Sequence, residues 1–228
     1  MSIETPVETA ATPSRRAEER TNATLLERDR RYRMQTRFTH PVCLTRGKGV
    51  RLTDVAGKEY LDFESGQVCA SVGHSNAEYV AAMREQLGRL VQTGSCYIDE
   101  KQVEFQEKLA ATTGGHFQQS YLACSGAESN EAALRLAKSY TGRSEIISFM
   151  GNYHGHTFGS WSITGFGGKA RAGYGPPMPG VTFLPTPFDY EVPNPPRLPA
   201  EDQGVIDACI RYCERAIDST TSGEPAAV

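Results

Sequence analysis

The segment YLACSGAESNEAALRLAKSY, residues 121–140, joins a short apolar run to a stretch with alanines and leucines at helical spacing. The run predicts a strand and the spacing predicts a helix. Between them, Ser125, Gly126 and Ala127 form a turn of small residues, where the amides of a helix start and the helix dipole favour an anion such as phosphate. Ser125 with Glu128 three residues later is also a capping box, which starts a helix without any ligand. The segment alone leaves both interpretations open.

The chain's composition limits its class. It has 228 residues, 39% hydrophobic and 22% charged, which suits a globular protein with a core. A net charge of −3 offers no electrostatic footprint for nucleic acid or an anionic membrane. No apolar run approaches the roughly 20 residues that span a bilayer, and the amino terminus lacks the apolar centre of a signal peptide. We therefore expect a cytoplasmic protein without nucleic-acid or membrane partners.

The cysteines and histidines give little support for a metal site. Six scattered cysteines form no CxxC pair and are expected to be reduced: Cys43, Cys69, Cys96, Cys124, Cys209 and Cys213. Cys209 and Cys213 share a face of a predicted helix and could supply half a metal site, but burial as small apolar side chains is favoured. His154 and His156 have no carboxylate near them in the sequence. We expect no metal centre.

The order of predicted elements indicates an α/β fold. Residues 1–20 read as a flexible arm. A charged helix, a hairpin over 49–63 with Gly57 in its turn, two amphipathic helices capped by Asn76 and Asp99, a buried strand over 144–150 and a helix over 204–218 follow in that order. Residues 165–199, rich in Gly and Pro, show no periodicity. We place domain boundaries after residues 20 and 75.

The helix after the Ser125 turn carries small residues on its inner face, including Ala132, Ala133 and Ala137. Small residues let a helix lie close to a sheet, which places its amino end at the strand edge where open α/β sheets bind ligands. Rival phosphate motifs fail on spacing: in GFGGKA a P-loop would need glycine where Ile163 stands and Ser or Thr where Ala170 stands. No GxGxxG follows a strand either. The phosphate interpretation of the turn therefore gains weight.

Three blocks together resemble the class III, pyridoxal-phosphate-dependent aminotransferases: LDFESGQVCASVGH (61–74), CSGAESNEAALRLAKSYTGR (124–143) and FMGNYHGHTFGSWSITG (149–165). Within that class, Gln67 and the run SGAESNEAA look most similar to the 2,2-dialkylglycine decarboxylase branch. The resemblance implies the fold-type I, aspartate aminotransferase-like fold in truncated form, with part of the large-domain sheet and the N-terminal part of the small domain. Residues 21–75 would be an N-terminal segment and 76–228 an incomplete cofactor-binding domain.

The resemblance also implies roles for individual residues. The turn at residues 125–127 (Ser125, Gly126 and Ala127) would hold the 5′-phosphate of pyridoxal phosphate through backbone amides and the serine hydroxyl. Tyr153, where the decarboxylase branch has a tryptophan, would stack on the pyridine ring with His154 beside it. Gln67 would grip the substrate carboxylate and thereby select the bond that breaks. The departure at Tyr153 leaves an ordinary transaminase as an alternative to a decarboxylase.

Two groups that the family chemistry needs are not found: the lysine that forms a Schiff base with the cofactor and the aspartate that pairs with the pyridine nitrogen. Four lysines considered as substitutes are interpreted as solvated surface residues: Lys101, Lys108, Lys138 and Lys169. We expect an N-terminal fragment, inactive alone, of an enzyme that acts on amino acids and keto acids and is a homodimer when complete. The alternative is a non-catalytic module that binds a phosphorylated ligand or a partner subunit.

Overall fold

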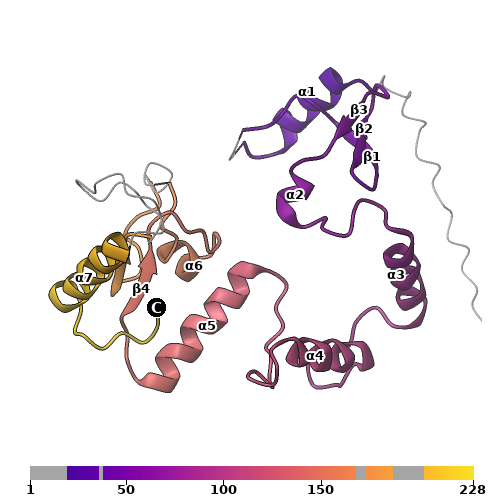
Figure 1. Ribbon diagram of the computed structural model, residues 1–228. Coiled ribbons are helices and arrows are strands. Elements are labelled where there is room, and N and C mark those ends of the chain that lie inside the picture. Colours follow the sequence, from indigo (N-terminus) through magenta and orange to yellow (C-terminus); the bar gives the residue numbers. More distant parts are fainter. Residues whose placement is uncertain (1–19, 36–37, 168–172, 187–202) are drawn as a thin grey trace, which may run out of the picture. The chain divides into compact units, whose positions relative to one another are not determined.

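The computed structural model describes residues 20–35, 38–167, 173–186 and 203–228, which form two compact units. The first unit ends at Asp99 and the second begins at Glu100. Figure 1 shows the helices and strands of the chain, coloured along the sequence. The predicted boundary after residue 75 concerns the family's domains and stays a prediction. The predicted flexible arm, apart from Arg20, lies outside the described residues.

The first unit contains a small antiparallel sheet in the order β1-β2-β3. Its elements are α1 (Asn22–Tyr32), β1 (Leu44–Lys48), β2 (Arg51–Asp54), β3 (Glu59–Leu61), α2 (Ser65–Val68) and α3 (Ala77–Arg89). The predicted hairpin is confirmed, with Leu52 opposite Tyr60 and Gly57 at φ 85° in its turn. The sequence did not predict β1, which extends the hairpin to three strands. Asn76 caps α3 as predicted, because its side chain accepts a hydrogen bond from the amide of Tyr79.

Asp54 ties α1 to the hairpin and is only 2% exposed. Its Oδ1 accepts hydrogen bonds from the amides of Ala56 and Lys58, both at 2.9 Å. Its Oδ2 accepts from the Asn22 side chain at 3.0 Å and the Tyr60 hydroxyl at 2.9 Å. The hydrogen bond from Asn22 lowers the pKa of Asp54 most, and the other three lower it further. One buried carboxylate thus closes the turn and anchors the helix.

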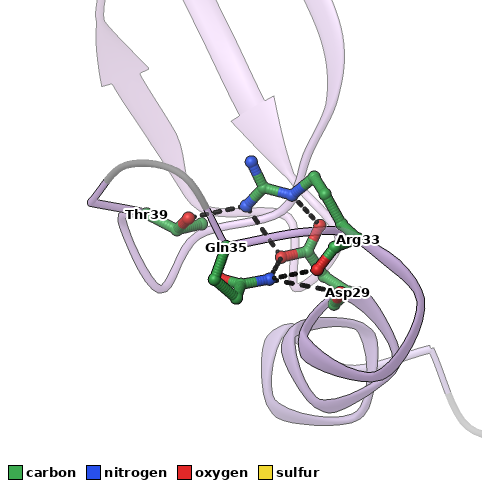
Figure 2. A network of polar contacts seen from close by, with 4 residues as sticks. All are labelled: Asp29, Arg33, Gln35 and Thr39. Atoms are coloured by element: carbon green, nitrogen blue, oxygen red, sulfur yellow. Dashed lines mark hydrogen bonds and ion pairs between the residues drawn. The ribbon is translucent and has the colours of Figure 1, made fainter. Parts of the chain in front are cut away.

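The end of α1 is fixed by the polar network in Figure 2. Arg33 donates from Nε and Nη2 to the two carboxylate oxygens of Asp29 at 2.6 and 2.8 Å, and Nη2 also donates to the Thr39 hydroxyl at 2.6 Å. The Gln35 side chain donates to the Arg33 carbonyl oxygen at 3.0 Å. The Arg33 guanidinium lowers the pKa of Asp29. The planar, two-pronged Arg33–Asp29 pair therefore directs the chain out of the helix.

The second unit is built on a parallel pair of strands. Its elements are α4 (Glu100–Thr112), α5 (Gly126–Thr141), β4 (Ile146–Phe149), α6 (Phe158–Ser162), β5 (Val181–Leu184) and α7 (Gln203–Thr220). β4 pairs with β5 in parallel, and on its other side Ile146 forms a parallel bridge with Ala227. Ile146 and Ile147 are at most 3% exposed, as predicted for a buried strand. Leu134 of α5, Ile146 and Ile163 form the core.

Two predictions in this unit need correction. Residues 121–124 are not a strand, because no described segment pairs with them and a strand exists only through its ladder. β5 lies inside the Gly- and Pro-rich stretch where no element was predicted. Its four residues, VTFL between Gly180 and Pro185, are too short to show a period but rich in strand-forming types. Residues 168–172 and 187–202 of that stretch lie outside the description.

Candidate functional site

The Ser125 turn lies at the amino end of α5, the helix labelled in Figure 1, and Ser125 is the N-cap of that helix. Ser125 is extended, and its Oγ accepts a hydrogen bond from the Glu128 amide at 3.2 Å, so Ser125 is confirmed as the N-cap, which is half of the predicted capping box. A Cβ placed on Gly126 would meet no atom within 4 Å. The Ser125 side chain occupies the Glu128 amide, so the space beside Gly126 leaves the amides that precede Glu128 for an anion. Ser125 Oγ also donates to the Glu128 carboxylate at 3.3 Å, and an anion at the turn would replace that acceptor.

Ala127 packs directly against the loop that carries Tyr153 and His154. Gly155 is buried with φ 131°, and a Cβ on it would lie 2.6 Å from the Ala127 Cβ and 2.7 Å from Ser160 Oγ. Only glycine allows the loop to approach the turn this closely. The structure thus brings five predicted residues together within one unit: Ser125, Gly126, Ala127, Tyr153 and His154.

Asn130, one turn into α5, holds the His154 backbone. Its side-chain amide donates to the His154 carbonyl oxygen at 2.8 Å. On the other side, the His154 amide donates to Thr164 Oγ1 at 3.0 Å, and Thr164 is fully buried. The backbone of His154 is therefore held from both directions, which fixes where the neighbouring Tyr153 begins.

Glu131, the next residue of α5, holds the far end of the same loop. Its Oε1 accepts hydrogen bonds from the Thr157 hydroxyl at 2.5 Å, the Gly159 amide at 2.7 Å and the Ser160 amide at 3.1 Å. Burial acts to raise the pKa of Glu131, but these three hydrogen bonds bring it below its ordinary value. Sequence reasoning assigned no role to Asn130 or Glu131. The available signal was two adjacent polar residues, at the start of a helix whose inner face is otherwise small.

Aromatic rings continue from Tyr153 across the unit's surface. Tyr153 is 56% exposed, and its ring meets His156 edge-on at 5.4 Å between centroids. His156 stacks on Trp161 at 5.3 Å, and Trp161 contacts Tyr174 at 5.4 Å. His156 therefore serves as a packing ring. Among the described residues, no three His, Cys, Asp or Glu side chains are placed to hold a metal ion.

Gln67 belongs to the first unit and lies in an unusual turn. Four successive residues, Ser65 to Val68, have φ between 53° and 68°, so α2 is a left-handed turn rather than a regular helix. Three of the four are not glycine, and each such residue costs about 1–3 kcal/mol. The chain turns tightly at Ser65 and Gly66, and Gln67 is exposed. Strain of this kind persists only where surrounding contacts impose it.

Three of the four lysines considered above lie within the described residues. Lys101 pairs with Glu104 at 3.0 Å, and Lys108 is exposed on α4. Lys138 Nζ is 3.4 Å from Met178 Sδ and, at 1.5 Å per residue, stands about 18 Å along α5 from Gly126. That separation keeps Lys138 away from the turn at the other end of the helix. Lys169 lies outside the described residues.

Cys209 and Cys213 are half-buried on α7. Burial is the larger cause that raises the pKa of Cys213, and the neighbouring Cys209 is the smaller one. A raised pKa favours the neutral thiol over the thiolate that binds metals. Both cysteines fit the predicted role of small apolar side chains.

The sequence profile of the aminotransferase class-III family matches residues 33–228, so the chain belongs to that family. Acetylornithine aminotransferase from Archaeoglobus fulgidus is 39% identical over 139 residues, which are 61% of this chain and 36% of that protein. The enzyme of the same name from Lactiplantibacillus plantarum is 41% identical over 143 residues, 63% of this chain and 36% of that protein. The aligned part of the chain thus spans little more than a third of these relatives.

Solved structures agree on the fold. An (S)-enantioselective omega-transaminase from Thermomicrobium roseum superposes with a TM-score of 0.80 and 29% identity, covering 92% of this chain and 49% of that one. Taurine:2-oxoglutarate aminotransferase from Bifidobacterium kashiwanohense was solved with pyridoxal phosphate and glutamate. It superposes with a TM-score of 0.80 and 26% identity, covering 92% of this chain and 47% of that one. The chain therefore has part of a fold-type I aminotransferase fold, in a class that depends on pyridoxal phosphate. No helix in the described ranges has the length and apolarity to cross a membrane.

Proposed function

We propose that this chain supplies the phosphate- and ring-binding half of a pyridoxal-phosphate site for amino-group transfer between amino acids and keto acids. The observation that supports the proposal is the contact of Ala127 with Gly155, which joins the Ser125 turn to the loop that carries Tyr153. The residues present fit the cofactor. Space beside Gly126 is open for a phosphate, and Tyr153 offers an exposed ring face.

Each residue has a defined task in this proposal. The amides at the start of α5 and the Ser125 hydroxyl bind the phosphate. Asn130 and Glu131 keep the aromatic loop in place, so that Tyr153 covers one ring face and excludes water. When bound, the cofactor supplies an electron-withdrawing ring that stabilises negative charge at the substrate's α-carbon.

The identities of the substrates are part of the proposal. The relatives named above are acetylornithine aminotransferases, which favours an amino acid with a second, acylated amino group as donor and a keto acid as acceptor. We further propose that the complete protein is a cytoplasmic homodimer and that the cofactor-bonding lysine and the aspartate for the ring nitrogen lie outside this sequence.

Borohydride reduction in the presence of pyridoxal phosphate, followed by peptide mass analysis, tests the cofactor assignment. We expect this chain alone to bind the cofactor reversibly, with competition by inorganic phosphate and without a stoichiometric adduct. Tyr153→Ala and Gly126→Ala should both weaken binding. A full adduct on one lysine of this chain would contradict the assignment of the lysine. Binding insensitive to phosphate, or no binding at all, would favour the alternative of a non-catalytic module.

Decarboxylation is the finer version of the proposal, and it depends on Gln67. The carboxamide of Gln67 can donate to a substrate carboxylate without contributing charge, and so fix which bond at the α-carbon is aligned for cleavage. The test is carbon dioxide release from 2-aminoisobutyrate by the protein as its gene encodes it, beside transamination of acetylornithine. Transamination without carbon dioxide release would leave a plain transaminase. Equal release by wild type and Gln67→Ala would remove Gln67 from the reaction.

A further inference from the structure

Asp62 lies three residues before the left-handed turn and binds the amide of Glu64, just before the turn, and the amide of Ser65, its first residue. Its Oδ1 accepts hydrogen bonds from the amides of Glu64 and Ser65, both at 2.9 Å. Its Oδ2 lies 2.6 Å from His74 Nε2. The Asp62 side chain is 8% exposed and that of His74 is 25% exposed. The hydrogen bond from His74 lowers the pKa of Asp62 most, and the hydrogen bond from the Ser65 amide lowers it further.

His74 is itself fixed to the hairpin. Its amide and its carbonyl oxygen pair with the carbonyl oxygen and the amide of Gly49, both at 2.9 Å. Its side chain lies over Gly47 of β1, because a Cβ on Gly47 would stand 2.8 Å from the His74 Cβ. The imidazole therefore reaches Asp62 from a rigid base. The sheet, His74, Asp62 and the turn form one continuous chain of contacts.

We propose that Asp62 and His74 act as a clasp that holds the turn Ser65–Val68 in its left-handed form and so sets the position of Gln67 toward the substrate carboxylate. They are positioning residues, since neither is assigned a contact with substrate. The inference rests on the role of Gln67 proposed above. Inside the turn, the Val68 amide donates to the Glu64 carbonyl oxygen and the Ala70 amide to that of Ser65, at 3.1 and 2.8 Å. These local bonds exist only while the turn keeps its conformation.

A purely structural role would not need this conformation. Hairpin β2-β3 closes through Asp54, and α3 begins at its own cap, so neither neighbour depends on positive φ at Ser65, Gln67 or Val68. Strain placed between two stable elements is typical of a site where a side chain must be aimed. The clasp supplies the contacts that oppose relaxation of the turn to ordinary backbone conformations.

Amide exchange measured by NMR on this chain tests the holding step directly. In His74→Phe, which keeps a ring but removes Nε2, exchange of the Ala70 amide should speed up by about tenfold or more as the turn opens. Asp54→Asn is the matched control: it weakens another carboxylate hub of the same unit and should leave the Ala70 amide unchanged. His74→Gln retains a donor and should restore part of the protection. Unchanged exchange in His74→Phe would overturn the clasp.

Substrate discrimination tests the positioning step. In the transamination assay we compare an amino acid with an amine of similar size that lacks the carboxylate. Gln67→Ala and His74→Phe should each lower the preference for the amino acid, mainly through KM, and the double variant should lower it no further. If only Gln67→Ala lowers it, the clasp is wrong and Gln67 keeps its role. If neither lowers it, the role of Gln67 is wrong, and amide exchange alone decides whether the clasp holds the turn.

Discussion

Two short turns of small and polar residues carry the candidate site residues, and they are built in different ways. Residues 125–127 take the ordinary geometry of a helix start, with Ser125 as cap and open space beside Gly126. The turn at residues 65–68 has four successive positive φ angles. Asp62, which precedes the turn, binds the Ser65 amide and is itself bound by His74 further along the chain. The first turn keeps its backbone conformation through the local Ser125 cap, whereas the second is bound by Asp62, which lies outside it, and through Asp62 by His74.

This difference determines how substitutions act. In the relaxed turn at residues 125–127, the free energy of unfolding depends on the packing of Gly155 against Ala127. Ligand binding depends on Gly126, which has no side chain to cover the backbone amides. In the strained turn at residues 65–68, replacing a side chain can stabilise the protein by removing strain, while replacing a holding residue releases the turn. Four substitutions test the contrast, ordered from the largest expected change in stability to the smallest.

Gly155→Ala should have the largest effect. The new Cβ would lie 2.6 Å from the Ala127 Cβ, and residue 155 has φ 131°. Overpacking and backbone strain together should lower the free energy of unfolding by about 3 kcal/mol. Urea unfolding followed by the fluorescence of Trp161, the chain's one tryptophan, measures it. Gly151→Ala is the control, because Gly151 has φ 78° with nothing within 4 Å of its Cβ position. Equal losses in both variants would show that the Ala127 contact is loose.

Glu131→Ala should cost about 2 kcal/mol, because two amides and a hydroxyl lose their acceptor. The pKa of Glu131 is lowered in the folded state, so its stabilisation is present above the ordinary glutamate pKa and is lost as pH falls through the lower, folded value. Urea midpoints at neutral pH and in the acid range should therefore converge for wild type and variant. The exposed Glu128→Gln is the control. A gap between Glu131→Ala and wild type that does not narrow in acid would contradict the assignment.

The sequence predicted those elements that local patterns specify. The helix after Ser125, the hairpin around Gly57 and the cap at Asn76 depend on residues within a few positions. The prediction of a strand at residues 121–124 was wrong, because apolar character favours a strand but cannot supply the partner strand that it needs. The sequence also gave no sign that Gln67 would have a positive φ, since non-glycine residues rarely do.

The candidate site likewise contains some residues that local motifs predicted and some contacts that they did not predict. Motif resemblance located Ser125 and Tyr153, and the packing of the loop on the turn agrees with it. The contacts of Glu131 with residues 157–160 join positions 26 to 29 apart in sequence, and the Asp62–His74 pair spans 12. Such contacts depend on how the chain returns to itself, which periodicity and spacing do not encode.

Val68→Gly should stabilise the protein. A β-branched residue at φ 68° is strained, and glycine adopts that conformation freely, so we expect a gain of about 0.5–1 kcal/mol after the greater flexibility of glycine in the unfolded chain is subtracted. Val72→Gly, at an exposed valine without positive φ, should instead lose stability. Thermal unfolding monitored by circular dichroism compares the two. If both variants lose stability alike, the turn is not under strain in solution.

Gly126→Ala should have the smallest effect on stability, within about 0.5 kcal/mol of wild type, because Gly126 lies in regular helical conformation with free space beside it. Gly142→Ala at the other end of α5 is the matched control. Gly142 has φ 70° as the left-handed cap, so the same methyl should cost about 1 kcal/mol there. Binding should show the reverse order. The methyl on Gly126 would cover amides of the turn that we propose binds the phosphate. Titration with pyridoxal phosphate should therefore give weaker binding for Gly126→Ala and unchanged binding for Gly142→Ala. If Gly126→Ala destabilised the protein as Gly142→Ala does, the turn would not be relaxed; if it left affinity unchanged, the phosphate would not lie at this helix start.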